Sequence, residues 1–355
     1  MQTLSTQTSL TNKYVLAYGV TVAFFFLSML TAVSIGTVSI PLVETVNIIG
    51  GQLFHLSIDD HIGAMHTNII VDIRLPRVLL AGLVGGSLAI SGAVFQGLLQ
   101  NPLADPYILG VSSGASVGAV ATLFFNISIP LLGLYTLPVL SIVTALLTMF
   151  VVLFFARQAD RAMRVETIIL TGVIFSSFLG SFISLIIALT DDRLQQIMGW
   201  LLGSVSMRGW DYIGIILPFF IIGTLILLMN SKELNALVFG EARAKHLGVD
   251  VQKRKIIILV AGSILTGAAV AVSGAIGFVG LVIPHMMRRL WGPDHRHLLP
   301  LSIITGAGFL MLTDLVSRTI ISPSVLPIGV ITALIGAPVF ALILMKQRKG
   351  MRGGL

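Results

Sequence analysis

Charged side chains crowd one short segment that lies between two long apolar stretches. Within residues 240–250 there are five ionisable side chains, namely Glu241, Arg243, Lys245, His246 and Asp250. The hydrocarbon core of a bilayer does not accept that density of charge. Alanines and other good helix formers fill the segment, and a glycine stands near each end of it. The pattern predicts a short helix at about 238–248 that lies against a membrane face; a solvated loop is the alternative.

Histidines and aspartates form a second group with possible chemistry, in the segment 36–73. The group consists of His55, Asp59, Asp60, His61, His66 and Asp72. Imidazole and carboxylate groups are common metal ligands, but this spacing matches no ligand motif. We therefore expect an external surface loop at about 36–73 and no metal site. The role of the three histidines stays open.

The sequence lacks the motifs from which common catalytic and nucleotide-binding sites are built. It contains no cysteine, no HExxH or GxSxG motif, and no GxxxxGK[ST] phosphate loop. Ion-coupled carriers need ionisable groups at mid-membrane, and Asp314 is the one acidic residue inside an apolar stretch. Arg318 follows it by four positions, which favours an ion pair on one helix face. We expect a chain that is not an enzyme and binds no cofactor, with an ion-coupled secondary transporter as a remote alternative.

The composition indicates an integral membrane protein. Of its 355 residues, 55% are hydrophobic and 10% are charged, and the mean hydropathy is +0.99. The net charge of +7 is spread over short segments between apolar stretches, so it indicates membrane topology and not a nucleic-acid partner. The first apolar stretch is too long for a signal-peptide core, which predicts an uncleaved first span.

Ten apolar windows are candidates for crossing a hydrocarbon core of about 30 Å. They are 14–35, 76–97, 107–125, 131–156, 167–189, 212–229, 256–273, 276–291, 298–320 and 326–345. If the short window 276–291 crosses, seventeen of the 22 Lys and Arg residues lie on one side and five on the other. The positive-inside rule then places the first side, with both termini, in the cytoplasm.

Several long motifs resemble the FecCD family, the permeases of ABC importers for iron-siderophores, haem and vitamin B12. The resemblance is carried by RLPRVLLAGLVGGSLAISGAVFQGLLQNPLADPYILGVSSGASVGA (74–119), GEARAKHLGV (240–249), SGAIGFVGLVIPHMMR (273–288), DHRHLLP (294–300) and LPIGVITALIGAPVFALIL (326–344). The motifs follow one another in the family's order. Segments 1–70 and 120–230 match mainly in hydropathy.

The resemblance implies an all-α fold and an assembly. The expected fold is the type II importer permease fold of the vitamin B12 transporters, with ten transmembrane helices in one domain, 1–355. Two permease subunits would enclose one pathway in the cytoplasmic membrane of a bacterium. Two ATPase subunits, which carry ATP and Mg, would dock inside, and a substrate-binding protein would dock outside.

The resemblance also implies three sets of functional residues. The expected ATPase-coupling residues are Gly240, Glu241, Ala244, Leu247 and Gly248. The expected binding-protein docking residues are Arg74, Arg77 and Arg318, as exposed external arginines. The expected cytoplasmic gate consists of Asn101, Leu103, Val165 and Glu166, the last two by position only.

The residues do not identify the cargo. An iron-siderophore is the first expectation, because it is the commonest cargo of the family, and vitamin B12 and haem stay open. Whether the second permease subunit is an identical copy or a paralogue stays open as well. The fifth window carries serine and threonine hydroxyls, which indicate either a pathway wall or hydroxyls that bond their own helix carbonyls.

Overall fold

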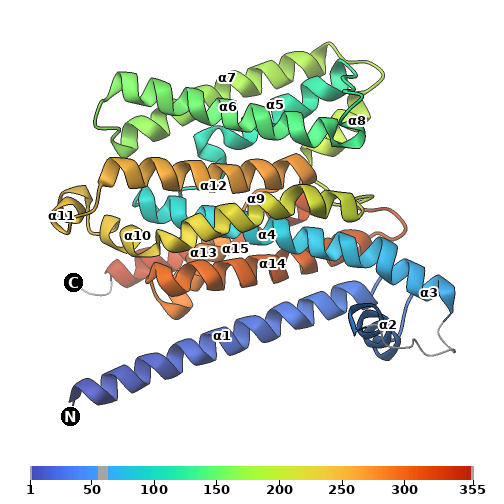
Figure 1. The fold of residues 1–355 in the computed structure, drawn as a ribbon, viewed down its shortest axis with the longest axis horizontal. Coiled ribbons are helices and arrows are strands. Elements are labelled where there is room, and N and C mark those ends of the chain that lie inside the picture. Colours follow the sequence, from blue (N-terminus) through green and yellow to red (C-terminus); the bar gives the residue numbers. More distant parts are fainter. Residues whose placement is uncertain (1, 55–62, 353–355) are drawn as a thin grey trace.

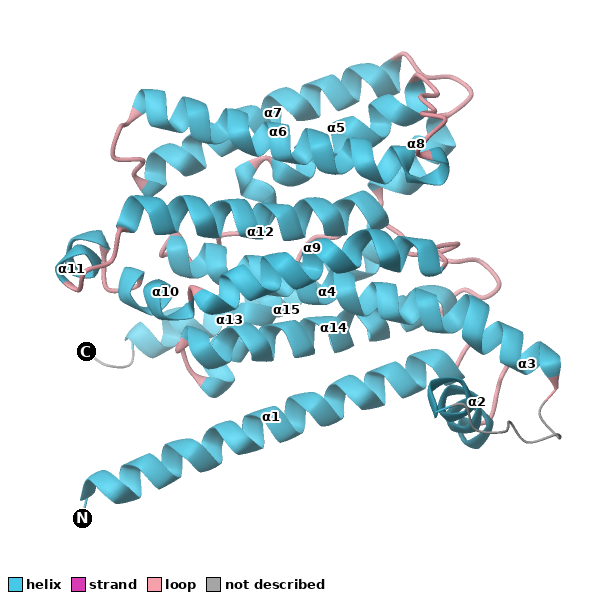
Figure 2. Cartoon of the chain, viewed as in Figure 1, coloured by secondary structure: helices cyan, strands magenta, loops and turns pink. Residues whose placement is uncertain are grey.

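The protein is a bundle of long, nearly antiparallel helices with shorter helices at both ends (Figures 1 and 2). The computed structural model describes residues 2–54 and 63–352, and these residues contain no strand. The elements before α6 are α1 (Gln2–Ser34), α2 (Leu42–Phe54), α3 (Ala64–Asn68), the π-helix η1 (Ile69–Arg74), α4 (Leu75–Leu98), η2 (Pro106–Leu109), α5 (Val111–Phe124) and η3 (Gly133–Tyr135). They are followed by α6 (Thr136–Ala159), α7 (Val165–Ala188), α8 (Leu194–Leu201), α9 (Trp210–Met229), α10 (Ser231–Leu237), α11 (Glu241–His246), α12 (Val251–Ser273), α13 (Val279–Trp291), α14 (His295–Thr319) and α15 (Ile328–Arg352).

Each of the ten predicted windows coincides with a helix. Seven helical segments of the described chain are long and apolar enough to cross a membrane, and α5, α13 and α15 account for the other three windows. The 13 residues of α13 rise only about 20 Å, less than a hydrocarbon core. The predicted all-α transmembrane fold is confirmed.

The charged helix α11 marks one end of the bundle. The described chain begins and ends near α11, whereas α2 and α3 lie at the opposite end (Figure 1). We call these the α11 end and the α2 end. Both termini therefore lie on the same side, as an even number of crossings requires. That the α11 end is cytoplasmic stays a prediction.

The segment 36–73 is not an irregular loop. Within its described part, α2 packs through Ile48 and Thr45, which are fully buried, and α3 and η1 run without interruption into α4. Most of the described part of the expected surface loop is thus helical, and Ile48 of α2 belongs to the same buried cluster as Ala32 and Val33 of α1. That this connection is external stays a prediction. His55 and His61 lie outside the described residues.

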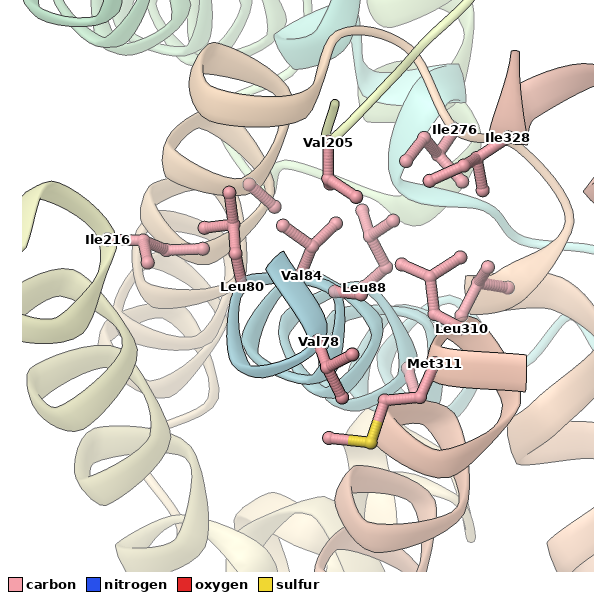
Figure 3. Packing of buried hydrophobic residues seen from close by; sticks show 14 of the residues in the cluster. Val78, Leu80, Val84, Leu88, Val205, Ile216, Ile276, Leu310, Met311 and Ile328 are labelled. Carbon is pink, nitrogen blue, oxygen red and sulfur yellow. The ribbon is translucent and has the colours of Figure 1, made fainter. Parts of the chain in front are cut away.

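Helix α4 occupies the centre of the bundle, between α9, α12, α13 and α14. Its side chains are buried almost throughout, with Leu80 directed toward Ile216 of α9 and Val78 toward Met311 of α14 (Figure 3). A Cβ atom on Gly92 would lie 1.8 Å from the carbonyl oxygen of Gly280, so the two backbones touch. In lipid, burial of apolar surface gives little driving force for helix association. Helices pack there through small residues, which allow two backbones to approach closely.

Candidate functional site

The short charged helix forms as predicted, between two glycines with positive φ. Helix α11 spans Glu241–His246, narrower than the predicted 238–248, and Val238 and Phe239 belong to the turn after α10. Gly240 has φ +100° and Gly248 has φ +83°. L-residues avoid these conformations, so the two glycines set where the helix begins and ends.

Helix α11 has one buried side and one exposed side. Ala244 is fully buried among the core residues, whereas Leu247 is 71% exposed and Phe239 is 65% exposed. Of the expected coupling residues, Ala244 thus anchors the helix and Leu247 is available to a partner. Phe239 was not among the predicted residues. The sequence feature that could have identified it is a large apolar side chain directly before a charged segment.

A polar groove of about 510 Å³ lies beside α11. It is lined by Leu247, Gly248 and Asp250 from the turn after α11 and by Lys232, Glu233 and Arg254, among others, from α10 and α12. Glu233 and Arg254 pair across it at 3.2 Å. The exposed apolar side chain of Leu247 therefore borders a hydrophilic depression at the α11 end.

The first pair of expected gate residues lies in the connection between α4 and α5. The Asn101 Oδ1 atom accepts a hydrogen bond from the Leu103 N–H at 2.9 Å, and Leu103 is 42% exposed. Asp105 caps η2 by accepting from the Tyr107 N–H at 2.9 Å. Burial raises the pKa of the Asp105 carboxyl to about 6, against the opposing effect of that hydrogen bond.

The second pair begins α7, directly after a tight turn. Asp160 accepts hydrogen bonds from the N–H groups of Ala162 and Arg164 and from the Arg164 side chain. The bond from the Arg164 side chain, followed by those from the backbone, lowers the pKa of Asp160 to about 2. Val165 and Glu166 are the first two residues of the helix that this turn starts.

The structure shows no hydrogen bond between the two pairs of expected gate residues within the described chain: none joins Asn101 or Leu103 to Val165 or Glu166. Instead η2 packs about two turns further along α7, where a Cβ atom on Gly172 would lie 2.6 Å from the Ile108 carbonyl oxygen. Whether these residues form a gate stays a prediction.

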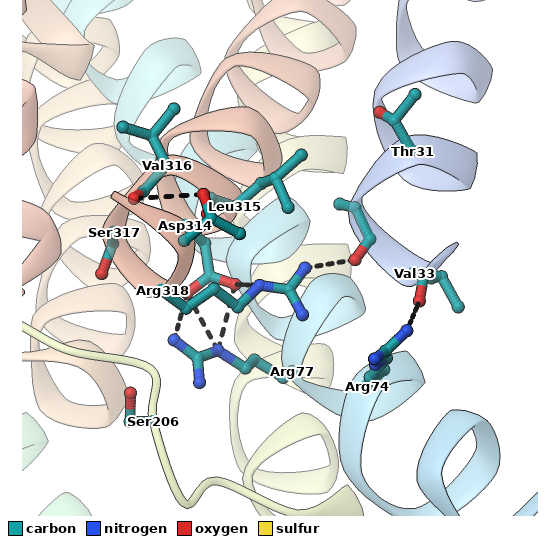
Figure 4. A network of polar contacts seen from close by, with 12 residues as sticks. Thr31, Val33, Arg74, Arg77, Ser206, Asp314, Leu315, Val316, Ser317 and Arg318 are labelled. Atoms are coloured by element: carbon teal, nitrogen blue, oxygen red, sulfur yellow. Dashed lines mark hydrogen bonds and ion pairs between the residues drawn. The ribbon is translucent and has the colours of Figure 1, made fainter. Parts of the chain in front are cut away.

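The expectation of exposed docking arginines was wrong for Arg74 and Arg318. Arg74 is 4% exposed and donates to the carbonyls of Val33 and Ser34 at 2.9 and 2.6 Å, and also to Val38. Arg318 is 8% exposed and donates to the Ala32 carbonyl. The last carbonyls of α1 have no partner within the helix, so they attract these cations (Figure 4).

Asp314 has a nearer partner than the one its spacing predicted. The Arg318 Nε atom lies 3.6 Å from Asp314 Oδ2. Arg77 of α4 is closer, because its Nε and Nη2 atoms both donate to Asp314 Oδ1, at 2.9 and 2.8 Å (Figure 4). Asp314 is fully buried, and 13% of the Arg77 side chain is exposed. Arg77 is thus the most accessible of the three arginines.

One face of α7 carries exposed hydroxyls. Ser177, Ser181 and Ser184 are exposed and spaced so that they share one side of the helix. Ser181 and Ser184 donate to the carbonyls four residues earlier, at 3.0 and 3.1 Å. These hydroxyls therefore donate to carbonyls of their own helix, which was one of the two expected alternatives. Their protons are not free to bind a ligand, so this serine face interacts weakly.

The described part of segment 36–73 contains no metal centre. His66 pairs with Glu44 of α2 through Nδ1 and Oε2 at 2.8 Å. No group of three or more His, Asp or Glu side chains in the described chain is arranged to hold a metal ion. His66 therefore ties α3 to α2.

Comparison with known proteins places this arrangement in a family. Residues 21–346 match the FecCD transport family. The chain is 59% identical to the uncharacterized ABC transporter permease protein YvrB of Bacillus subtilis (strain 168), over 99% of both chains. It is 42% identical to a cobalamin import system permease of Halobacterium salinarum, over 79% of this chain and 74% of that one. It is 39% identical to a hemin transport system permease of Yersinia pestis, over 81% and 86%.

A solved structure agrees with the fold. It is described as an inward-facing conformation of a metal-chelate type ABC transporter, and it aligns with a TM-score of 0.80 at 34% identity. The alignment covers 93% of this chain and 99% of that chain. The family match, the relatives and the solved structure all point to one family. The chain belongs to the FecCD transport family.

Proposed function

We propose that this permease moves a metal chelate, with an iron-siderophore complex as the first candidate, through an ATP-driven importer. As a FecCD member the chain is a multi-pass permease subunit of an ABC importer, a transport component whose ATPase is a separate subunit. Vitamin B12 and haem are the alternative cargoes. Cobalamin and haemin are themselves metal chelates, and the solved relative is described by that class.

The observation that carries the proposal is the form of α11. A six-residue helix projects beyond the spans, held by buried Ala244 and presenting exposed Leu247. An apolar anchor beside a polar groove suits insertion into a cleft of a cytoplasmic partner. We assign Gly240, Glu241, Leu247 and Gly248 to ATPase coupling, with Ala244 as the residue that seats the helix.

Support for a shared pathway comes from α7. Its exposed serines lie on a surface that this chain alone leaves uncovered. A pathway for a bulky chelate needs a wall that does not hold the cargo, and back-bonded hydroxyls offer few free donors. A second permease subunit, identical or paralogous, would supply the opposite wall. Asn101, Leu103, Val165 and Glu166 are proposed to close it at the α11 end.

We further propose that a substrate-binding protein docks at the α2 end. Arg77 offers a partly exposed guanidinium there, which suits recognition of an acidic partner. Arg74 and Arg318 would contribute only by exchanging their carbonyl partners in α1 for acidic groups. Ion coupling through Asp314 is disfavoured, because the carboxylate is fully buried and already paired with two arginines.

The experiment that tests the proposal is transport by the reconstituted assembly. Proteoliposomes that contain the permease, its ATPase, its binding protein and internal ATP should accumulate the chelate even after an uncoupler has collapsed the proton gradient. The permease alone should accumulate none. Uptake by the isolated chain under a pH gradient, abolished in Asp314→Asn, would instead establish a secondary transporter.

The cargo is tested separately with the binding protein. Ferric siderophores, cobalamin and haemin should be titrated into it while its intrinsic fluorescence is followed. Tight binding of a ferric siderophore alone is the expected result. Preference for cobalamin or haemin would reassign the cargo without changing the transport mechanism.

A further inference from the structure

Lys255, in the second turn of α12, is a buried cation with two partners from different parts of the chain. The residue is 1% exposed. Its Nζ atom lies 2.5 Å from Glu241 Oε1 of α11 and donates to the Met163 carbonyl at 2.9 Å. An ammonium group buried in apolar surroundings is costly unless it is paired and hydrogen-bonded, so both contacts are needed to hold it there.

The partner carbonyl belongs to the turn that starts α7. Met163 is itself 4% exposed and has φ +48°. A second bond from α12 reaches the same turn, because Gln252 Nε2 donates to the Arg161 carbonyl at 3.1 Å. The first two turns of α12 therefore hold the 160–164 turn at two points.

The 160–164 turn is internally braced. The Asp160 carboxylate accepts two backbone N–H groups of the turn and the Arg164 side chain. A turn fixed in this way transmits displacement to the next residues of the chain instead of absorbing it. Those residues are Val165 and Glu166, the proposed gate residues at the start of α7.

We propose that Lys255 is the positioning residue that joins α11 to the start of α7, so that displacement of α11 by the ATPase moves the gate. This inference rests on the proposed function. The Glu241 carboxylate and the Met163 carbonyl are both acceptors, so neither can bond to the other; the lysine ammonium between them makes the connection. Because separating either contact leaves a buried charge short of a partner, α11, α12 and the turn favour moving as one body.

The first test separates ATP hydrolysis from transport in the full assembly. Lys255→Met keeps an unbranched side chain of similar length but removes both contacts. Uptake per ATP hydrolysed should fall about tenfold, within the usual range of coupling between sites, while hydrolysis by the docked ATPase continues. Lys13→Met, at an exposed lysine of α1 that does not line the groove beside α11, is the control and should keep the wild-type ratio.

A second variant keeps the inference testable if Lys255→Met does not assemble. Glu241→Ala truncates a side chain that is 35% exposed and leaves the bond from Lys255 to the Met163 carbonyl in place. It should also lower uptake per ATP. An unchanged ratio in Glu241→Ala, or in an assembled Lys255→Met, would overturn the inference.

A spectroscopic measurement distinguishes a positioning role from a merely structural one. The chain has no cysteine, so Ala162→Cys and Leu290→Cys can carry a pair of spin labels, one on the turn and one at an exposed position near the end of α13. In the wild-type assembly ATP binding should change the distance between the labels. In Lys255→Met it should not, although the ATPase still binds; a full change there would overturn the inference.

Failure of the inference and failure of the proposed function give different results. If the wild-type assembly does not accumulate chelate with ATP, the proposed function fails whatever Lys255 does. If the wild-type assembly accumulates chelate and the Lys255 variants remain fully coupled, only the inference fails.

Discussion

Arg77 of α4 holds both carboxylate oxygens of Asp314 of α14, although the two residues are 237 positions apart: Nη2 and Nε donate to Oδ1, and Nε also donates to Oδ2. Pairing of one guanidinium with both oxygens is the strong form of the arginine–carboxylate contact. With Arg318 also close to Oδ2, the site joins the central helix to α14 at the α2 end.

Removing the charge of Asp314 should destabilise the permease strongly. Asp314→Asn leaves the buried guanidinium of Arg318 and the partly exposed one of Arg77 without their counter-charge, a loss of about 3 to 5 kcal/mol for a buried pair. The midpoint of thermal unfolding in detergent measures it. Asp211→Asn, at an exposed carboxylate of α9, should be nearly neutral. Equal midpoints for Asp314→Asn and the wild type would contradict the buried pair.

Arg74 should act through stability more than through docking. Arg74→Met leaves the carbonyls of Val33, Ser34 and Val38 without their donor, at about 1 to 3 kcal/mol for each unsatisfied group. Affinity of the folded protein for its binding protein should be retained, whereas Arg77→Ala should weaken it a few-fold. Binding isotherms and unfolding midpoints separate the two effects. Weaker binding by an equally stable Arg74→Met would show that Arg74 leaves its site when the binding protein docks.

Substitutions at Leu247 and Ala244 should separate ATPase binding from the stability of the permease. Leu247→Asp should reduce co-purification of the ATPase and leave the unfolding midpoint of the permease unchanged, because Leu247 is 71% exposed. Ala244→Asp should lower the midpoint, because it places a carboxylate at a fully buried site. Normal ATPase binding by Leu247→Asp would remove the main support for coupling through this helix.

Asp105 should make stability fall as the pH rises. Its carboxyl has a pKa of about 6 in the folded chain against an ordinary 3.8. The folded state therefore binds more protons between these values, and stability decreases from about pH 4 to about pH 6, by on the order of 3 kcal/mol. Asp105→Asn should abolish that part of the profile and be the more stable protein at neutral pH. Asp192→Asn, an exposed control, should keep the wild-type slope.

Bulk on the serine face of α7 should block transport. Ser181→Phe places a ring on the proposed pathway wall, so uptake should fall by an order of magnitude or more while Ser181→Ala remains active. Leu225→Phe, at an exposed position of α9, is the control for bulk on an outer surface. Full activity of Ser181→Phe in a well-assembled transporter would place the pathway elsewhere.

The sequence by itself determined the helices at the ten apolar windows and the short charged helix. These features depend on local hydropathy and on where glycine permits a turn, and neither needs a distant contact. The glycines at 240 and 248 bounded α11 because few other residues adopt their φ values.

Tertiary structure alone decided which charges are exposed and which helix faces meet. The sequence predicted Arg74 and Arg318 on an outer surface, but the carbonyls that bury them come from the end of α1. In the sequence, Lys255 is one of several positive charges close to an apolar stretch. Only the tertiary structure shows that it lies between Glu241 and the Met163 carbonyl. A charged side chain is buried only where its partners converge, and those partners come from helices far apart in the chain, so spacing along one helix does not reveal them.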